Sequence, residues 1–205
     1  PQTFTITVNP TPTVVQPANQ VLCNGATTNT ITFAGAVSGT TYSWINSNTS
    51  IGLGANGNGN IPSFTAVNAG TTSVTATITV TPTAAGCAGL PQTFTITVNP
   101  TPTVVKPANQ TLCNGATTNT ITFAGAVSGT SFSWSNNNNT IGLPGSGTGN
   151  IASFTAINLT NAPVTATITV TPTAAGCAGA PQTFTITVNP TPTVVQPANQ
   201  VLCNG

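Results

Sequence analysis

The sequence predicts an all-β fold, in which antiparallel β-sandwich domains of about 90 residues follow one another in tandem. Three observations lead to this prediction. The segment PQTFTITVNPTPTVV begins at Pro1, Pro91 and Pro181, so the chain repeats with a period of 90 residues (91 − 1 and 181 − 91). Stretches rich in Thr, Val and Ile are separated by clusters of Gly, Asn and Pro. No stretch has the pattern of a helix longer than one turn.

The predicted strands alternate apolar and polar residues. Phe4, Ile6 and Val8 share one face of the first strand, and the intervening threonines share the other. Residues 74–81 have the same period of two, and shorter strands are expected around residues 31–33, 42–44 and 64–66. The glycine-rich stretch Gly52–Asn60 lacks the Lys-Ser/Thr of a phosphate-binding loop, so we expect a mobile surface loop there.

The two full copies of the repeat are nearly identical. They differ at about 20 positions, and these cluster at residues 45–73 of the first copy and 135–163 of the second. A period of 90 residues is too long for a solenoid coil and suits a small globular domain. Each copy is therefore expected to have its own core and a variable middle segment.

The domain boundaries are predicted from prolines. Asn-Pro-Thr-Pro follows the first strand and its two copies, and alternating proline stops a β-ladder. We interpret Pro10, Pro12, Pro100, Pro102, Pro190 and Pro192 as short linkers. Residues 1–9 are then the last strand of a preceding repeat, 10–99 and 100–189 are whole domains, and 190–205 begin a following repeat.

Charged side chains are almost absent, which limits the possible functions. Lys106 is the one charged side chain in 205 residues, and the sequence has no Asp, Glu or His. Acid–base catalysis and glycoside hydrolysis use such groups, so we expect no enzyme. Carboxylate calcium sites and CxxC zinc sites lack their ligands, and one lysine makes no basic surface. We therefore expect no metal, no cofactor, no nucleic-acid partner and no membrane insertion of this segment.

Trp44 and Trp134 lie at the same position of the two copies, in the third predicted strand. Ig-like sandwiches carry a core tryptophan at that place. Both tryptophans are therefore predicted to anchor a hydrophobic core.

Each predicted domain contains two cysteines, which indicates a disulfide in an oxidising compartment. We favour pairing within each domain, Cys23 with Cys87 and Cys113 with Cys177, each over 64 positions (87 − 23 and 177 − 113). The alternative pairs Cys87 with Cys113 and Cys177 with Cys203 across the linkers. In a plain Ig topology the first and last loops lie at opposite poles, so pairing within a domain requires Cys23 to lie near the domain entry or on an early strand.

The motifs VLCNG, YSW, TAAGCAG and FTITVNPTP together resemble the PKD-like repeats of very large bacterial surface proteins, including gliding-motility and biofilm adhesins. The resemblance covers essentially the whole chain. It implies tandem Ig-like (PKD-like) antiparallel β-sandwich domains, a cell-surface location and a role in a stalk or in adhesion. The absence of acidic residues departs from relatives that depend on calcium.

The expected function is structural. We predict a segment of an extracellular surface fibre or adhesin stalk, whose partners are the neighbouring repeats of the same chain. Edge strands without protective charges also allow association with other copies into a filament. The alternative is a module that binds glycans or another surface through the variable loops at 45–73 and 135–163.

Overall fold

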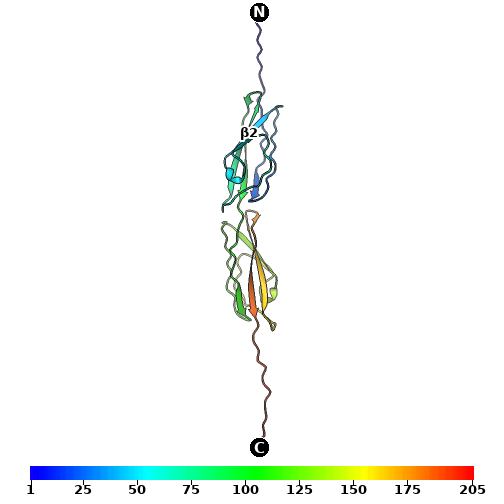
Figure 1. Ribbon diagram of the computed structural model, residues 1–205, viewed down its shortest axis with the longest axis vertical. Coiled ribbons are helices and arrows are strands. Elements are labelled where there is room, and N and C mark those ends of the chain that lie inside the picture. Colours follow the sequence, from blue (N-terminus) through cyan, green and yellow to red (C-terminus); the bar gives the residue numbers. More distant parts are fainter. The chain divides into compact units, whose positions relative to one another are not determined.

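A computed structural model describes residues 1–205, and the chain forms two compact units. The first contains Pro1–Thr103 with two short segments, Ala126–Thr130 and Thr173–Gly179. The second contains Val104–Gly125, Ser131–Pro172 and Ala180–Gly205. Each unit is a β-sandwich, as predicted from the alternating threonine-rich strands (Figure 1). No helix is long and apolar enough to span a membrane.

The first repeat forms one six-stranded sheet, ordered β1-β6-β4-β2-β3, with β5 also paired to β4. Strands β1 and β6 are parallel, and the other pairs are antiparallel. A single turn of 3-10 helix, η1 (Thr49–Ile51), follows β2. The strands are β1 (Gln20–Cys23), β2 (Thr41–Asn46), β3 (Asn56–Asn58), β4 (Val74–Ala84), β5 (Cys87–Ala88) and β6 (Gln92–Asn99).

The second repeat has the same elements in the same order. Its sheet is ordered β7-β12-β10-β8-β9, with β11 paired to β10. The last residues of β10 and the whole of β11 belong to the first compact unit. The elements are β7 (Gln110–Cys113), β8 (Ser131–Asn136), η2 (Asn139–Ile141), β9 (Ser146–Thr148), β10 (Val164–Ala174), β11 (Cys177–Ala178) and β12 (Gln182–Asn189).

The period of two in the sequence places apolar side chains in the core. Ala76, Ile78 and Val80 of β4 are fully buried, and they lie on the inner face of the sheet with the apolar residues of β6. Threonines of β4 and β6 lie opposite each other on the outer face, and the hydroxyls of Thr75 and Thr97 are 2.9 Å apart. The same alternation buries Ala166, Ile168 and Val170 in the second repeat.

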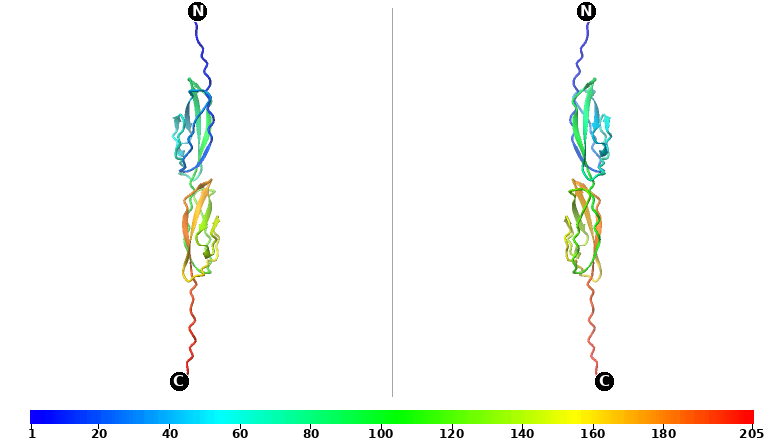
Figure 2. Two further views of the ribbon diagram at one scale, coloured as in Figure 1. Left: turned by 90° about the vertical axis from the view of Figure 1, so that its right-hand side faces the viewer. Right: turned by 90° about the vertical axis from the view of Figure 1, so that its left-hand side faces the viewer.

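The layer that faces this sheet is made of extended segments (Figure 2). Isolated bridges join them, from Thr27 to Thr65 and from Ile31 to Ile61. Side chains replace part of the ladder, because Asn60 Oδ1 accepts a hydrogen bond of 2.9 Å from the Phe33 amide. The strands expected around residues 31–33 and 64–66 are therefore single bridges. A side chain that satisfies a backbone donor removes the need for a neighbouring strand at that point.

Two predicted features differ in detail. Gly52–Asn60 is not only a loop, because β3 lies within it and pairs with β2. Of the predicted linker prolines, Pro12, Pro100 and Pro102 are buried, whereas Pro10 and Pro192 are exposed and Pro190 is half-buried. Val14, two residues after the buried Pro12, belongs to the first core.

Candidate functional site

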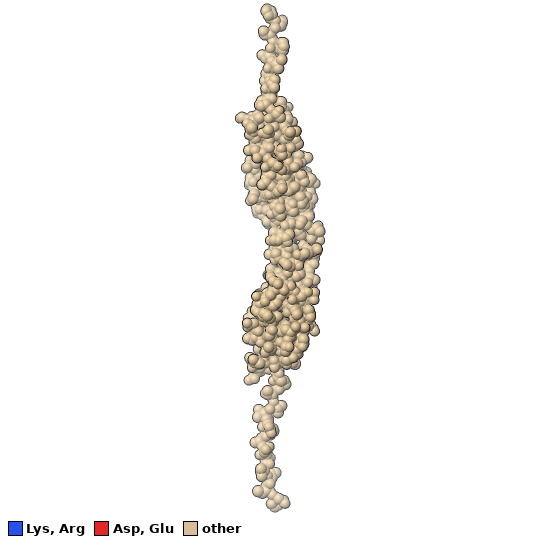
Figure 3. All heavy atoms as spheres, turned by 180° about the vertical axis from the view of Figure 1, so that it is seen from behind, with Lys and Arg blue, Asp and Glu red and all other residues tan.

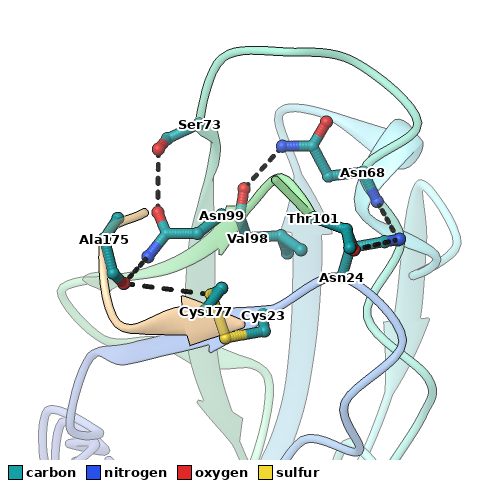
Figure 4. Close-up of a disulfide and its surroundings, with 9 residues drawn as sticks. All are labelled: Cys23, Asn24, Asn68, Ser73, Val98, Asn99, Thr101, Ala175 and Cys177. Carbon is teal, nitrogen blue, oxygen red and sulfur yellow. Dashed lines mark hydrogen bonds between the residues drawn. A yellow bond between two sulfur atoms is a disulfide. The ribbon is translucent and has the colours of Figure 1, made fainter. Parts of the chain in front are cut away.

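The site that distinguishes this chain is a disulfide between Cys23 and Cys177, whose Cα atoms are 5.6 Å apart (Figure 4). It lies within the first compact unit, and it joins a cysteine of the first repeat to a cysteine of the second. Cys87, Cys113 and Cys203 are free. The structure therefore differs from both predicted pairings.

Strand pairing positions Cys23 at one end of the sheet. Strand β1 runs parallel to β6, which places Cys23 opposite Asn99, the last residue of β6. The Asn24 amide donates to the Asn99 carbonyl at 2.8 Å, and this bond extends the ladder by one residue. Cys23 thus lies where the main chain leaves the first repeat.

Cys87 lies at the other end of the same sheet, which explains why the two cysteines of one repeat do not pair. Val74 at the start of β4 is opposite Val98, the neighbour of the Asn99 that lies opposite Cys23. Cys87 is instead opposite Ala84, at the other end of β4. Ten residues of strand separate these ends, or about 33 Å. A disulfide requires Cα atoms within about 7 Å. The alternative bond from Cys87 to Cys113 is also absent, because both thiols are free.

Cys177 is presented by a tight hairpin between β10 and β11. The two turn residues, Ala175 and Gly176, have positive φ values of 48° and 78°, as a two-residue hairpin of this kind requires. An alanine in the left-handed region costs about 1 kcal/mol. Ala175 carries this cost, and its carbonyl accepts a hydrogen bond in the site.

Asn99 connects this hairpin to the sheet. Its side-chain Nδ2 donates to the Ala175 carbonyl at 3.1 Å, and its Oδ1 accepts a hydrogen bond of 2.7 Å from the Ser73 hydroxyl (Figure 4). Asn99 is 7% exposed and Cys177 is 2% exposed. Because both groups are buried and Asn99 uses both ends of its amide, the hairpin is held at a fixed position beside Cys23.

A second asparagine braces the loop next to Cys23. Asn68, which is 4% exposed, donates from Nδ2 to the carbonyls of Thr72 at 2.8 Å and Val98 at 2.7 Å. Its backbone amide donates to Asn24 Oδ1 at 2.8 Å, and Asn24 Nδ2 donates to the Thr101 hydroxyl at 3.2 Å. These bonds tie three loops together around the disulfide without any charged group.

Both predicted core tryptophans are buried, Trp44 in the first hydrophobic core and Trp134 in the second. Each ring packs on a glycine of the neighbouring edge strand, and a Cβ on Gly57 would lie 2.7 Å from Trp44 Cε2. Neither indole nitrogen has a hydrogen-bond partner. The Gly57 and Gly147 positions thus serve the core, a role that their place in a glycine-rich stretch did not reveal.

The surface offers amides and hydroxyls rather than charges. Figure 3 shows no charged side chain on the face that it presents. The structure contains no group of three or more His, Cys, Asp or Glu side chains that could hold a metal ion. Every position from 45 to 73 at which the two repeats differ is exposed, and the same holds for the matching positions of the second repeat. The variable segment therefore varies only at the surface.

Comparison with solved structures finds tandem immunoglobulin and cadherin domains. DIP-gamma Ig1+Ig2 is 11% identical, with a TM-score of 0.45, and the match covers 88% of this chain and 98% of that one. Sidekick-1 immunoglobulin domains 1–4 are 12% identical, with a TM-score of 0.46 and coverage of 87% and 48%. Mouse cadherin-23 EC22–24 is 15% identical, with a TM-score of 0.38 and coverage of 88% and 65%.

No curated protein matches the sequence. The family comparison is positive, because the model described as "PKD-like domain" matches twice, at residues 20–102 and 110–192. The two matches have the same 90-residue offset as the sequence repeat and cover most of the chain. The chain therefore belongs to the PKD-like domain family and carries two of its domains in tandem.

Proposed function

We propose that this chain is a structural segment of an extracellular surface fibre or adhesin stalk, of the kind found in large bacterial surface proteins. The observation that carries the proposal is the disulfide from Cys23 to Cys177. A stalk must keep its repeats in series under load, and a covalent bond between consecutive repeats serves that purpose. Disulfides persist in oxidising, extracellular compartments.

The chemistry of the surface supports the same role. PKD-like and Ig-like domains are typically structural modules. The exposed side chains are mainly Thr, Asn and Ser, which keep strands soluble without titratable groups. A fibre outside the cell requires stability and solubility over a range of conditions, and neither depends here on a charge state.

Surface location is tested with antibodies raised against the repeats. Intact cells of the source organism should bind the antibody, and brief treatment with an external protease should remove the signal. Labelling that needs permeabilised cells would overturn the proposal. The stalk role is tested by adding repeats: each added repeat should lengthen the particle in electron micrographs by a constant step of about 35 Å, estimated from the eleven residues of β4.

Association of copies into a filament is part of this proposal. Strand β1 is at the edge of its sheet, and Val21 on it is 69% exposed, with no charge nearby to oppose pairing with another strand. Sedimentation at rising concentration should show oligomers, and Val21→Lys should reduce them. Thr93→Lys, on the interior strand β6, is the matched control. A chain that stays monomeric at the highest concentration would refute this part.

A second candidate function is recognition of glycans. It is favoured by the exposure of every repeat difference between residues 45 and 73 and by a hollow of about 590 Å³ in the first repeat. Hydroxyl and amide groups line it beside one aromatic ring, from Thr40, Thr41, Tyr42, Ser43, Asn58, Gly59 and Thr83. Tyr42 and Asn58 become Phe132 and Thr148 in the second repeat. A glycan array should show binding that is lost when residues 45–73 are replaced by 135–163 together with Tyr42→Phe; unchanged binding would argue against this site.

A further inference from the structure

The two bonded cysteines occupy different positions of the 90-residue repeat, and each of them has a free counterpart elsewhere in the chain. Cys177 is the counterpart of Cys87 one repeat later (87 + 90 = 177), so the bond joins the first cysteine of one repeat to the second cysteine of the next. Cys113 is the counterpart of Cys23 (23 + 90 = 113). The free thiols of Cys87 and Cys113 therefore occupy the two positions that are bonded elsewhere in the same chain.

The surroundings of Cys113 match those of Cys23. Strand β7 runs parallel to β12 and places Cys113 opposite Asn189, as Cys23 is opposite Asn99. The Asn114 amide donates to the Asn189 carbonyl at 2.9 Å, and Asn114 Nδ2 donates to the Thr191 hydroxyl at 3.2 Å. Cys113 is exposed, so its thiol is accessible to a partner.

The loop brace is also repeated in the second unit. Asn158, the counterpart of Asn68, donates from Nδ2 to the carbonyls of Ala162 at 2.8 Å and Val188 at 2.7 Å. Its amide donates to Asn114 Oδ1 at 2.9 Å. The half of the site that holds the first cysteine is thus complete before any bond forms.

The surroundings of Cys87 match those of Cys177. The turn residues Ala85 and Gly86 have positive φ values of 46° and 76°, as in the Ala175–Gly176 hairpin. Asn9 Nδ2 donates to the Ala85 carbonyl at 3.3 Å, as Asn99 Nδ2 does to Ala175. Asn9 is the counterpart of Asn99, the residue opposite Cys23. The Asn9 contact is independent evidence that the hairpin of Cys87 receives the end of a preceding repeat.

We propose that in an array of this repeat every first cysteine is bonded to the second cysteine of the following repeat. Cys113 then pairs with a cysteine at position 267 of a longer chain (177 + 90), and Cys87 pairs with the first cysteine of a preceding repeat. Each bond forms by thiol–disulfide exchange with a small disulfide oxidant such as oxidised glutathione. Two thiols lose two protons and two electrons, and one oxidant disulfide becomes two thiols.

The test uses the full chain lengthened at Gly205 by a copy of residues 26–99, which completes a third repeat. Cys87→Ser and Cys203→Ser leave four cysteines whose neighbours all differ. Cys23 follows Val21-Leu22, Cys113 follows Thr111-Leu112, Cys177 precedes Ala-Gly-Ala, and the added cysteine precedes Ala-Gly-Leu. Mass spectrometry of disulfide-linked peptides, prepared at acidic pH after oxidation with glutathione, then assigns every bond.

The expected result is two bonds, Cys23 to Cys177 and Cys113 to the added cysteine. A bond from Cys113 to Cys177, a bond from Cys23 to the added cysteine, or free thiols at both Cys113 and the added cysteine would each overturn the proposal. In the matched control, Cys113→Ser, the added cysteine should be a free thiol while the bond from Cys23 to Cys177 remains. Loss of the latter bond in the control would show that the register is not set locally and would also contradict the inference.

Discussion

Removing the disulfide is the sharpest perturbation of this molecule. Cys177→Ser opens a loop that spans 154 positions. In the chain-entropy model, closing such a loop destabilises the unfolded state by about 5 kcal/mol, and measured values are commonly smaller. We therefore expect the free energy of unfolding to fall by about 2 to 5 kcal/mol. Cys23→Ser removes the same bond, so the two losses should be equal, and the double variant should lose no more than either one.

Urea unfolding followed by tryptophan fluorescence measures this loss. Each repeat has a single tryptophan, so Trp44→Phe leaves Trp134 to report on the second repeat and Trp134→Phe leaves Trp44 to report on the first. Separate reporters are needed because two domains can unfold in separate steps. Both reporters should show the loss, since both repeats contribute residues to the closed loop.

The period provides matched controls. Cys87→Ser and Cys113→Ser make the same change at the equivalent positions, but both thiols are free. Each should change the free energy of unfolding by less than about 0.5 kcal/mol, as for other surface substitutions. If Cys177→Ser and Cys87→Ser have the same stability under oxidising conditions, the disulfide of the folded protein is not the one described above.

Three further outcomes follow from the structure. Gly57→Ala should destabilise the first repeat by about 1 to 3 kcal/mol in urea unfolding, because a Cβ would overlap the Trp44 ring. A Cβ on Gly54 would have nothing within 4 Å, so Gly54→Ala should be near neutral, and equal effects of the two changes would contradict this. Asn68→Ala leaves the buried Val98 carbonyl without its side-chain donor and should lower the free energy of unfolding by about 1 to 3 kcal/mol by the same measurement, whereas a loss below about 0.5 kcal/mol would refute the brace. The free energy of unfolding should stay constant between about pH 4 and pH 7, because no Asp, Glu or His is present to bind protons differently in the folded and unfolded chains; a slope in urea midpoint over this range would contradict it.

The fold class was predictable because the alternation of apolar and polar residues indicates directly which face of a strand is buried. Alternation in residues 74–81 indicates which residues of β4 are buried, and the prediction of tandem sandwiches is confirmed. Trp44 lies in the core, at a place where its strand position predicts a core residue. The domain boundaries at 10–99 and 100–189 stay a prediction.

The disulfide could not be derived from spacing. Two cysteines 64 positions apart in a 90-residue repeat look like a pair until the pairing partner of β1 is known. Parallel pairing of β1 with β6 places Cys23 opposite Asn99, at the end of the sheet where the main chain leaves the repeat. No local pattern in the strand sequence QVLC reveals that register. The one sequence signal was geometric: an Ig topology separates the first and last loops, which already weighed against a bond within the domain.

The residues around β3 illustrate a second limit. Gly57 looks like a loop glycine because short edge strands rich in Gly and Asn lack the β-branched residues that indicate a strand. Its structural reason, space for the Trp44 ring, depends on a contact between strands that the sequence pattern does not encode.

The span of the disulfide also determines what a cut in the main chain does. The ring over 154 positions is longer than the 90-residue period, so a protease that cleaves at one point between Cys23 and Cys177 leaves one connected molecule. Pairing within each domain would leave 26 positions of every period, from Cys87 to Cys113 (113 − 87), outside any ring. With the bridge repeated along an array as proposed, every peptide bond is bypassed at least once. A fibre of this design would keep its continuity after single cuts by the proteases that it meets outside the cell.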